Sequence, residues 1–553
     1  MGKQSSHKKI KKITKVKPSA VPKGDSQYIY WVILIAVVLF IGFIRLRLLG
    51  IPLERDEGEF AYMGQLILQG IPPYLVSYNM KLPGIYAAYA FIMSVFGQTV
   101  EGIHFGFLLV NAATIILMFL LAKRIYDSYT GIITSASFGI LSVSPSVLGT
   151  SAHASHFVLF PALGGILLML KAVDSDKPKH LFWGGVLLGL SFIMKQPGIF
   201  FVIFALLYYL FSLGRLHDAS MRLVVKRGCL FLLGAIIPFV LICLILYGVG
   251  VFEKFWFWTF SYASQYVSER PLMMGMQSFI VGLKTAIGNF YLLWGIAAFG
   301  IIALFRDKTT RSRAGFVFGF SILSFLAVCP GLYFRPHYFV FFLPAVTLLI
   351  GIGISFIKRL LLELRPAFQS LSTISFLIVF SLSIALYGHF FFDLAPEEAC
   401  RFMYGSLFPE SKEIGEYIRA HSTREDKIAV LGSEPQIFFY SNRHSATGYI
   451  YTYPLMENQK YALQMQKEMI EEIEKAQPTY LIFVNLNSSW FVQKNSEKYI
   501  FNWFMGYRTR YYDLVASLDP EIEPGGGDQG GPYLFRSLHY LEMYKRRTDA
   551  RVH

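Results

Sequence analysis

The stretch YIYWVILIAVVLFIGFIRLRLLGIPLERDEGEFAYMG, residues 28–64, joins a long apolar run to a cluster of acidic side chains. The run over 28–44 approaches the ~20 apolar residues that an α-helix needs to cross a bilayer. No small-residue cleavage site follows it, so we interpret it as an uncleaved first span behind a basic tail over 1–27. Asp56 and Glu57 follow about a dozen residues later, close to the membrane surface.

The composition of the whole chain agrees with a membrane protein. Of its 553 residues, 54% are hydrophobic and 16% are charged, against roughly 45–50% and about 25% in soluble domains. This excludes a soluble multidomain protein, a disordered chain and a nucleic-acid-binding module, and it predicts a polytopic α-helical membrane protein. The net charge of +15 comes from Lys and Arg that cluster between apolar runs, where they set orientation.

Further apolar runs predict about eleven membrane spans in total. A shorter run over 83–97 is expected to be a juxtamembrane or re-entrant helix on the outer side. The predicted spans lie near 28–44, 102–122, 130–148, 156–171, 181–194, 198–213, 228–249, 281–305, 314–329, 337–357 and 371–387.

The distribution of basic residues predicts the orientation. With the N-terminus in the cytoplasm, the cytoplasmic segments hold 24 Lys and Arg, and the outer gaps before residue 388 hold 8. The positive-inside rule therefore favours a cytoplasmic N-terminus in an inner or plasma membrane. An odd number of spans then places 388–553 in the periplasm or outside the cell.

We expect three parts: the tail 1–27, a transmembrane domain over 28–387 with an outer loop at 45–101, and a soluble domain over 388–553. In the last part, KIAVLG (427–432) and TYLIFVN (479–485) are typical of buried strands, and 455–477 has the two faces of a helix. Alternating strands and helices predict an extracytoplasmic α/β domain. PEIEPGGGDQGGP, 520–532, is typical of a flexible loop.

The first outer loop holds the residues with the most evident chemistry. The carboxylates of Asp56 and Glu57 could act as a general base toward an acceptor hydroxyl, could hold Mg²⁺ or Mn²⁺, or could only stabilise a helix N-terminus. Lys81 precedes a proline at the start of an apolar stretch, where its ammonium could bind a lipid phosphate or simply reach toward the headgroups.

Several motifs in order resemble one enzyme superfamily. They are the acidic pair after the first span, then K-x-P…Y…FG from Lys81, then the apolar run ending LLAKRIY. GLSFIMKQPG (189–198) and RPHYFVFFLPA (335–345) follow at the expected places. Over residues 28–350 the chain resembles the C-type glycosyltransferases, in the protein O-mannosyltransferase-like and lipid A aminoarabinose transferase-like branch.

The resemblance implies transfer of a hexosyl or pentosyl group, with inversion, from a polyprenyl-phosphate donor on the outer side. It implies that Asp56 is the catalytic acidic residue with Glu57 beside it, and that Lys81 binds the lipid phosphate. Other substrate or phosphate ligands are then Lys195 of the hairpin, Arg270 (matched by its loop), Arg335, His337 and Tyr338.

Two departures from the family pattern concern metal and sugar binding. His153 and His156 stand where relatives often carry an acidic residue, and Asn79 replaces a carboxylate before the lysine. Two histidines at this spacing could bind zinc or could form a polar cap on a span. A divalent cation is thus possible, with Asp56, Glu57, His153 and His156 as candidate ligands, and no cofactor is certain.

Two other functions stay open at this point. An oligosaccharide ligase or polymerase with a diphosphate-linked donor would use outer Arg and His residues such as Arg335 and His337. A lipid-linked sugar transporter or flippase would need ionisable residues within the spans, where Lys284 is the clearest example. The expected partners are the polyprenyl-phosphate-linked sugar, a lipid, glycan or protein acceptor, and membrane lipids, with no nucleic acid.

Overall fold

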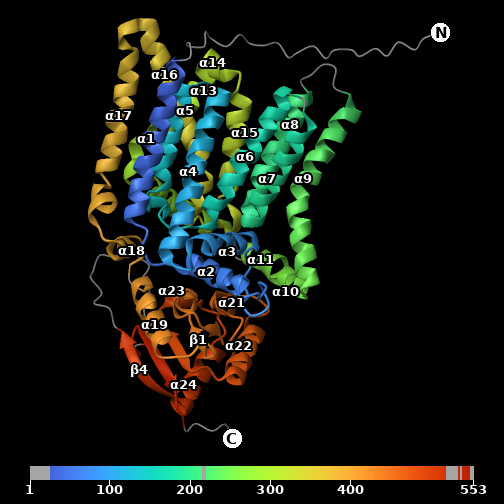
Figure 1. The fold of residues 1–553 in the computed structure, drawn as a ribbon, viewed down its shortest axis with the longest axis vertical. Helices are drawn as coiled ribbons and strands as arrows, with labels where there is room; N and C mark the ends of the chain where they lie inside the picture. Colours follow the sequence, from blue (N-terminus) through green and yellow to red (C-terminus); the bar gives the residue numbers. More distant parts are fainter. Residues whose placement is uncertain are drawn as a thin grey trace, which may run out of the picture.

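A computed structural model describes most of the chain, and it has a helical bundle at one end and a sheet domain at the other (Figure 1). Residues 1–24 of the expected tail and the expected loop 520–532 lie outside the described residues. The described ranges are 25–175, 177–214, 220–268, 270–405, 407–518, 534–535 and 538–548.

The bundle confirms a polytopic helical membrane fold. Within the described ranges, eight helical stretches are long and apolar enough to cross a membrane. They contain α1 (Asp25–Arg47), α4 (Val100–Ile125), α6 (Ala154–Ser175), α8 (Ile199–Gly214), α9 (Met221–Gly248), α12 (Leu272–Ile287) with α13 (Tyr291–Arg306), α16 (Leu343–Leu364) and α17 (Gln369–Ala385).

The remaining three predicted spans coincide with shorter helices, so the number eleven stays a prediction. These helices are α5 (Ser128–Ser142), α7 (Pro178–Met194) and α15 (Ala314–Leu326).

The predicted span over 281–305 is interrupted at Gly288. There α12 ends, and α13 begins three residues later. Gly288 has φ +47°, and a Cβ at this position would lie 2.0 Å from Ser146 Oγ and 2.4 Å from Tyr387 Oη. Only glycine allows both this backbone conformation and this close approach, so the long apolar run divides into two helices.

Two helices lie between the bundle and the sheet domain, α2 (Arg55–Leu68) and α3 (Gly84–Phe96) (Figure 1). The position of α3 agrees with the expected juxtamembrane helix over 83–97. α2 begins at a capping box, in which the Glu54 side chain accepts from the Glu57 N–H and the Glu57 side chain accepts from the Glu54 N–H. This cap fixes where the acidic motif starts its first helical turn.

The C-terminal part forms a five-stranded mixed sheet with the order β2-β1-β3-β5-β4. β1 pairs in parallel with β2 and β3, whereas β5 pairs antiparallel with β3 and β4. The two predicted strands are confirmed as β1 and β3, and the predicted helix as α22 (Ala462–Ala476). The strands are β1 (Lys427–Leu431), β2 (His444–Ser445), β3 (Tyr480–Val484), β4 (Tyr512–Leu518) and β5 (Leu541–Arg546).

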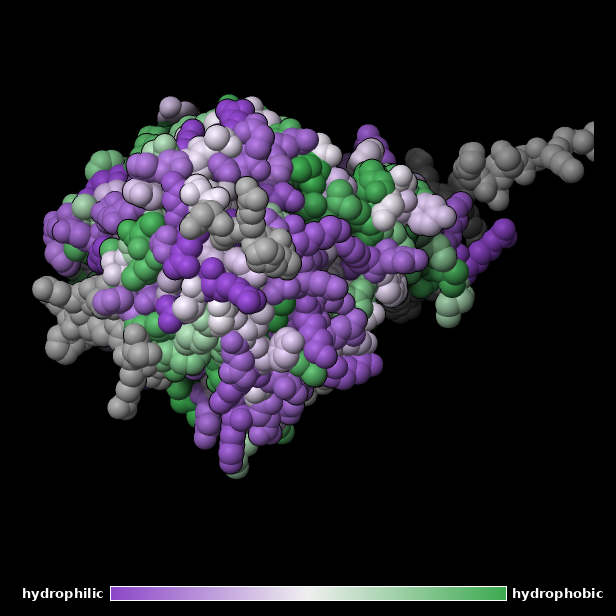
Figure 2. Space-filling model, turned by 90° about the horizontal axis from the view of Figure 1, so that it is seen from below, coloured by the Kyte–Doolittle hydropathy of each residue, from purple (hydrophilic) through white to green (hydrophobic). Residues whose placement is uncertain are grey.

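Hydrophilic side chains predominate on the end of the molecule that this domain forms (Figure 2). That surface is typical of contact with water rather than lipid. Besides α22, the helices of the C-terminal part are α18 (Pro396–Tyr404), α19 (Phe408–Ala420), α20 (Gln436–Ser441), α21 (Tyr453–Met456), α23 (Asn487–Trp490) and α24 (Tyr499–Tyr511).

The sheet domain packs directly on α2. Arg55 Nη2 lies 2.7 Å from the buried Glu434 carboxylate, and the Leu53 N–H donates to Tyr440 Oη at 2.8 Å. A Cβ on Gly58 would lie 2.5–2.6 Å from the Cβ, Cα and N of Gln436 in α20. The helix that carries the acidic motif is therefore held against a segment almost 400 residues later.

We expect Gly58→Ala to destabilise the protein by about 1–3 kcal/mol, because the added methyl group overlaps backbone that has no room to move. The thermal-unfolding midpoint of the purified protein measures the effect. Gly42→Ala is the matched control, since a Cβ on Gly42 meets no atom within 4 Å. Equal midpoints for the two variants would show that this contact is not tight.

Candidate functional site

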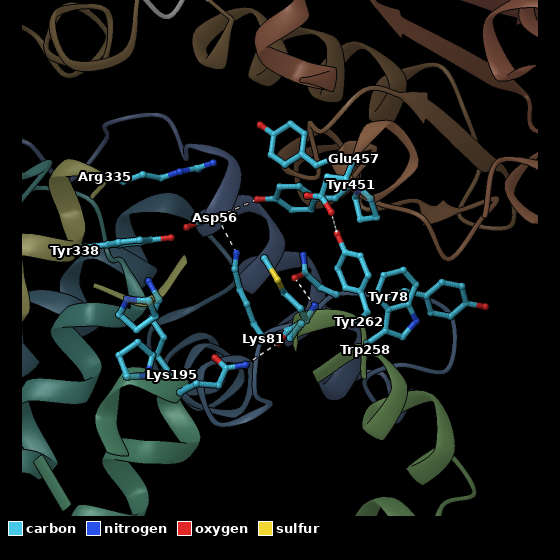
Figure 3. A pocket seen from close by; sticks show the side chains of 18 of the residues that line it. Asp56, Tyr78, Lys81, Lys195, Trp258, Tyr262, Arg335, Tyr338, Tyr451 and Glu457 are labelled. Atoms are coloured by element: carbon cyan, nitrogen blue, oxygen red, sulfur yellow. Dashed lines mark hydrogen bonds and ion pairs between the residues drawn. The ribbon is translucent and has the colours of Figure 1, made fainter. Parts of the chain in front are cut away.

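A cavity of about 190 Å³ lies where α2, the bundle and the sheet domain meet (Figure 3). Six segments line it: the first turn of α2, the loop before α3, the turn after α7, the segment containing Trp258 and Tyr262, the stretch that leads into α16, and the stretch around α21. Of the residues expected at the site, it brings together Asp56, Lys81, Lys195, Arg335 and Tyr338.

An ammonium between two carboxylates forms one wall of the cavity. Lys81 Nζ lies 2.7 Å from Asp56 Oδ1 and 2.6 Å from Glu59 Oε2. Tyr451 Oη donates to Asp56 Oδ1 at 3.1 Å, and Tyr86 Oη donates to Glu59 Oε1 at 2.5 Å. Asp56 and Glu59 share a helix face because they are three residues apart.

This arrangement keeps Asp56 and Lys81 charged, whereas burial raises the pKa of Glu59. Burial acts to raise the pKa of Asp56, but the neighbouring Lys81 ammonium outweighs it and holds that pKa well below its usual range. Burial acts to lower the pKa of Lys81, and Asp56 and Glu59 together raise it above its ordinary value. Asp56 is therefore a carboxylate, and Lys81 an ammonium, at neutral pH.

The opposite wall presents further cationic groups. Lys195 follows α7, which ends at Met194, and its Nζ lies 4.4 Å from the centre of the Tyr338 ring. Arg335 and Tyr338 lie at the start of the short helix η6 (Pro336–Phe341). Burial lowers the pKa of Lys195 to about 8, with Asp56 opposing that change. Cations and a phenol so arranged can bind a phosphate group.

Glu57 is not brought into the cavity. Its buried carboxylate accepts from the Ala152 N–H at 2.5 Å and lies 2.9 Å from His104 Nε2. These contacts fix the loop before α6 against α2. The catalytic role expected for Glu57 stays a prediction, because its carboxylate does not line the cavity.

Arg270 lies near the site but outside the cavity lining. Its guanidinium stacks 4.0 Å from the centre of the Tyr333 ring and donates to Ser278 Oγ at 2.7 Å. It neighbours the segment that carries Arg335, so a direct part in phosphate binding stays a prediction.

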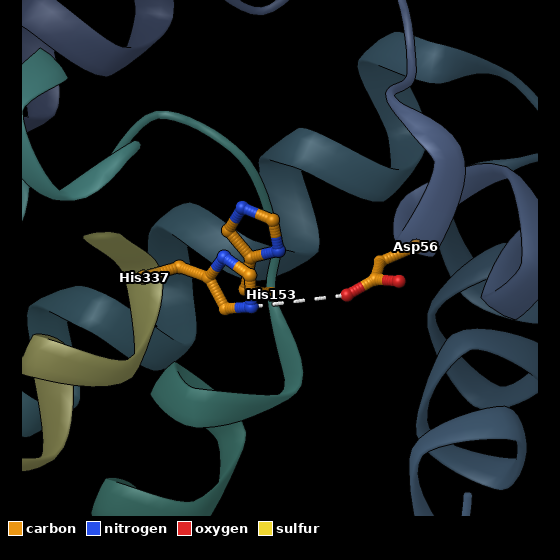
Figure 4. Close-up of side chains that lie close together, drawn as sticks. All are labelled: Asp56, His153 and His337. Carbon is orange, nitrogen blue, oxygen red and sulfur yellow. Dashed lines mark ion pairs between the residues drawn. The ribbon is translucent and has the colours of Figure 1, made fainter. Parts of the chain in front are cut away.

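The histidines separate into two groups. His156 packs its ring 4.9 Å from that of Phe107, away from His153. His153 instead stacks on His337, with ring centres 4.1 Å apart (Figure 4). His337 Nε2 lies 3.9 Å from Asp56 Oδ2. The histidine that lies beside His153 is therefore His337, and not His156 as the sequence spacing suggested.

Asp56, His153 and His337 are candidates to hold a divalent cation. One ligand atom of each lies within 4.8 Å of the others, and burial lowers the pKa of His153 to about 4, which keeps its ring neutral. The residue types suit zinc. The rings, however, are parallel within 13°, so their in-plane lone pairs do not converge, and Lys81 holds the other oxygen of Asp56. The three residues are of types that bind zinc, but their ligand atoms do not point toward a common centre. The mechanism proposed below therefore uses no metal ion.

Several lining residues were missed by the sequence reasoning. Tyr451, Tyr453 and Glu457 come from the sheet domain, and Tyr262 donates a hydrogen bond to the Glu457 carboxylate, whose residue is 7% exposed. The run YIYTYP over 449–454 was the available signal. It concentrates aromatic side chains in a loop, where they are not needed for a strand or helix core.

Comparisons with known proteins concern the family and the fold. Residues 81–245 match the family model of dolichyl-phosphate-mannose-protein mannosyltransferases. Among solved structures, ArnT from Cupriavidus metallidurans bound to undecaprenyl phosphate has 14% identity, a TM-score of 0.59, and coverage of 96% of this chain and 100% of that chain. ArnT in the apo state has 14% identity, a TM-score of 0.57, and coverage of 89% and 97%.

The archaeal oligosaccharyltransferase AglB from Archaeoglobus fulgidus, in complex with an inhibitory peptide and a dolichol-phosphate, has 11% identity and a TM-score of 0.54 over 94% of this chain and 89% of that chain. No curated protein matches in a sequence search. The fold shared with ArnT and AglB and the matched family model together confirm the resemblance to the C-type glycosyltransferases of the protein O-mannosyltransferase-like branch.

Proposed function

We propose that this protein is an integral membrane glycosyltransferase that moves a sugar from a polyprenyl-phosphate donor to an acceptor, with inversion. The observation that carries the proposal is the single cavity in which the Asp56 carboxylate shares its walls with Lys81, Lys195 and Arg335. Similar proteins bind undecaprenyl phosphate or dolichol-phosphate. A hexosyl or pentosyl group is the sugar class that we propose.

The geometry suits the loss of a phosphate from an anomeric carbon. Negative charge grows on the leaving lipid phosphate, and Lys195, Arg335 and the Tyr338 hydroxyl can stabilise it in a buried site. An ammonium has three N–H donors. Lys81 uses two of them on Asp56 and Glu59 and keeps one for the phosphate.

Asp56 acts on the sugar and on the acceptor hydroxyl. Its carboxylate stabilises the positive charge that develops on the sugar, and it orients or deprotonates the acceptor hydroxyl for attack. Its depressed pKa ensures that it is ionised when the acceptor arrives. Inversion follows because acceptor and phosphate occupy opposite faces of the sugar carbon.

We further propose that the sheet domain and the cavity lie on the outer side of an inner or plasma membrane, with a cytoplasmic N-terminus and domain limits at 27 and 387. Basic residues of α14 (Lys308–Arg311) and of the turn from α16 to α17 lie at the opposite end of the bundle (Figure 1). The positive-inside rule places that end in the cytoplasm. Reporter tags after His389 and within the turn following Leu364 test this orientation.

The decisive experiment is transfer from a purified polyprenyl-monophosphate sugar to an extract of candidate acceptors, with the protein in detergent. Release of polyprenyl phosphate with transfer of the sugar supports the proposal. Use of a nucleotide sugar in its place would refute it. Exclusive use of a diphosphate-linked donor favours a ligase, and movement of the intact lipid across liposomes without transfer favours a flippase.

The pH profile should report on Lys195. Because its ammonium loses a proton near pH 8, kcat/KM for the donor falls as the pH rises through about 8, and this ratio reflects the free enzyme. In Lys195→Arg the guanidinium stays charged, so the fall near pH 8 disappears. Lys179→Arg, an exposed lysine in the first turn of α7, at the end of that helix away from Lys195, keeps the wild-type profile as the control. An unchanged fall in Lys195→Arg would assign it to another group.

A further inference from the structure

A second cavity, of about 560 Å³, adjoins the first on the side of the sheet domain. It lies between α10 (Phe252–Trp256) with the segment that follows it and α22 of the sheet domain. Tyr78 and Trp258 line both cavities. An occupant of this groove would therefore lie next to the proposed reaction centre, and its volume is in the range of ligand pockets.

Aromatic rings form the floor of the groove. Tyr78 and Trp258 stack with ring centres 5.7 Å apart and planes within 19°, and Tyr449 meets both with its edge. Phe257 and Tyr461 continue the surface, with ring centres 5.2 Å apart. Trp258 and Tyr449 are buried, so the half-buried rings of Tyr78, Phe257 and Tyr461 are the surfaces that can meet the C–H face of a sugar ring or a cation.

Carboxylates form the rim. Glu468, Glu471 and Glu472 lie at spacings of three and four on α22, so they share one face of the helix. Glu253 contributes from α10 across the groove. Among the described residues that line it, Lys254 is the one cation, and it donates to Tyr78 Oη at 2.9 Å.

Two of these carboxylates also build the floor. Glu472 accepts from Tyr78 Oη at 3.1 Å and from the Gly448 N–H at 2.8 Å, and Glu468 accepts from Tyr449 Oη at 2.5 Å. Glu253 and Glu471 are exposed at the rim. The groove is thus preorganised and locally negative, in a chain whose net charge is +15.

From this combination we infer that the groove binds the acceptor as an amine-bearing saccharide. Sugar rings stack on the aromatic floor, and protonated amines pair with the rim carboxylates. A peptide is disfavoured because the described lining residues belong to helices and loops, which offer no strand edge for main-chain pairing. This inference rests on the proposed transferase function and adds its acceptor class.

Binding to the intact purified protein in detergent tests the inference without requiring catalysis. The probes are a glucosamine hexamer, a glucose hexamer with the same linkage, and hexalysine, compared by calorimetry at pH 6. We expect the glucosamine hexamer to bind at least tenfold more tightly than either other probe, with affinity that falls as salt rises.

The Glu253→Gln/Glu471→Gln variant removes rim charge and leaves the carboxylates that hold Tyr78 and Tyr449. It should weaken glucosamine-hexamer binding about tenfold or more. The charge-matched control is Glu413→Gln/Glu416→Gln on the exposed face of α19, which should bind like the wild type. Equal binding of the glucose hexamer or of hexalysine, or no effect of the rim variant, overturns the inference.

The failures of the two proposals are distinguishable. Transfer from the polyprenyl-phosphate sugar without saccharide binding at the groove rejects the acceptor class and leaves the transferase function standing. Selective binding of the glucosamine hexamer without any transfer activity keeps the groove as a binding site and removes its role as an acceptor site.

Discussion

Asp56→Asn should reduce the transfer rate by about 10²–10⁴-fold, the range associated with loss of a general acid or base. The amide has nearly the same shape as the carboxylate, but it carries no charge to stabilise the developing positive charge on the sugar. Lys81 keeps its contact with Glu59, so the wall of the cavity stays in place. Single-turnover transfer at saturating donor measures the loss without a contribution from product release.

Two controls are needed to interpret the activity of Asp56→Asn. Asp174→Asn, at an exposed ion pair with Arg124 in the membrane bundle, should retain full activity. The Asp56→Asn protein should also elute and unfold like the wild type. Full activity of Asp56→Asn would exclude this carboxylate from the reaction.

Lys81→Met should have the second large effect, on both stability and transfer. The substitution leaves the partly buried Asp56 carboxylate and the buried Glu59 carboxylate without their shared ammonium. Breaking a buried ion pair by removing one partner costs about 3–5 kcal/mol. Transfer should also fall because the leaving phosphate loses one of the N–H donors that we propose for it.

The double variant Lys81→Met/Glu59→Gln separates these two effects. Removing the second carboxylate relieves the repulsion, so the thermal-unfolding midpoint should return much of the way toward the wild type. Transfer should stay low, because no ammonium is restored. Recovery of transfer in the double variant would mean that Lys81 serves the fold and not the reaction.

The sequence predicted the parts of the fold that depend on hydrophobicity. Each predicted span falls on helical structure, because length and apolar composition are the properties that a bilayer selects. The interruption at Gly288 was missed because it depends on Tyr387 and Ser146, which the chain brings to that point only after folding. A hydropathy pattern carries no information about such contacts.

The site was predictable to the extent that short motifs define it. Asp56 and Lys81 were identified from their order along the chain, and they meet at 2.7 Å. Asp56 and Glu57 lie on different faces of α2, since successive helical residues point about 100° apart. Only Asp56 therefore points into the cavity. Had the sequence analysis placed the N-cap of this helix at Glu54, it would have put Asp56 on the same helix face as Glu59 and not on that of Glu57.

The contributions of the sheet domain could not be predicted. Tyr451 and Glu457 reach the cavity only because α20 packs on α2 at Gly58, a contact set by shape and not by any repeated pattern. His337 likewise joins His153 through the packing of η6 beside the loop before α6. Contacts between residues far apart in the chain cannot be predicted from the spacing of residues along one sequence.

The hydrogen bond from Tyr451 to Asp56 also orders events during synthesis. These two residues are 395 positions apart, and a ribosome that adds 5–20 residues per second needs roughly 20–80 s to cover that distance. Throughout that time Asp56 is already translated, whereas Tyr451 and the neighbouring lining residues of the sheet domain are not. A chain released before residue 451 therefore lacks the hydroxyl that donates to Asp56, and its cavity is open on that side.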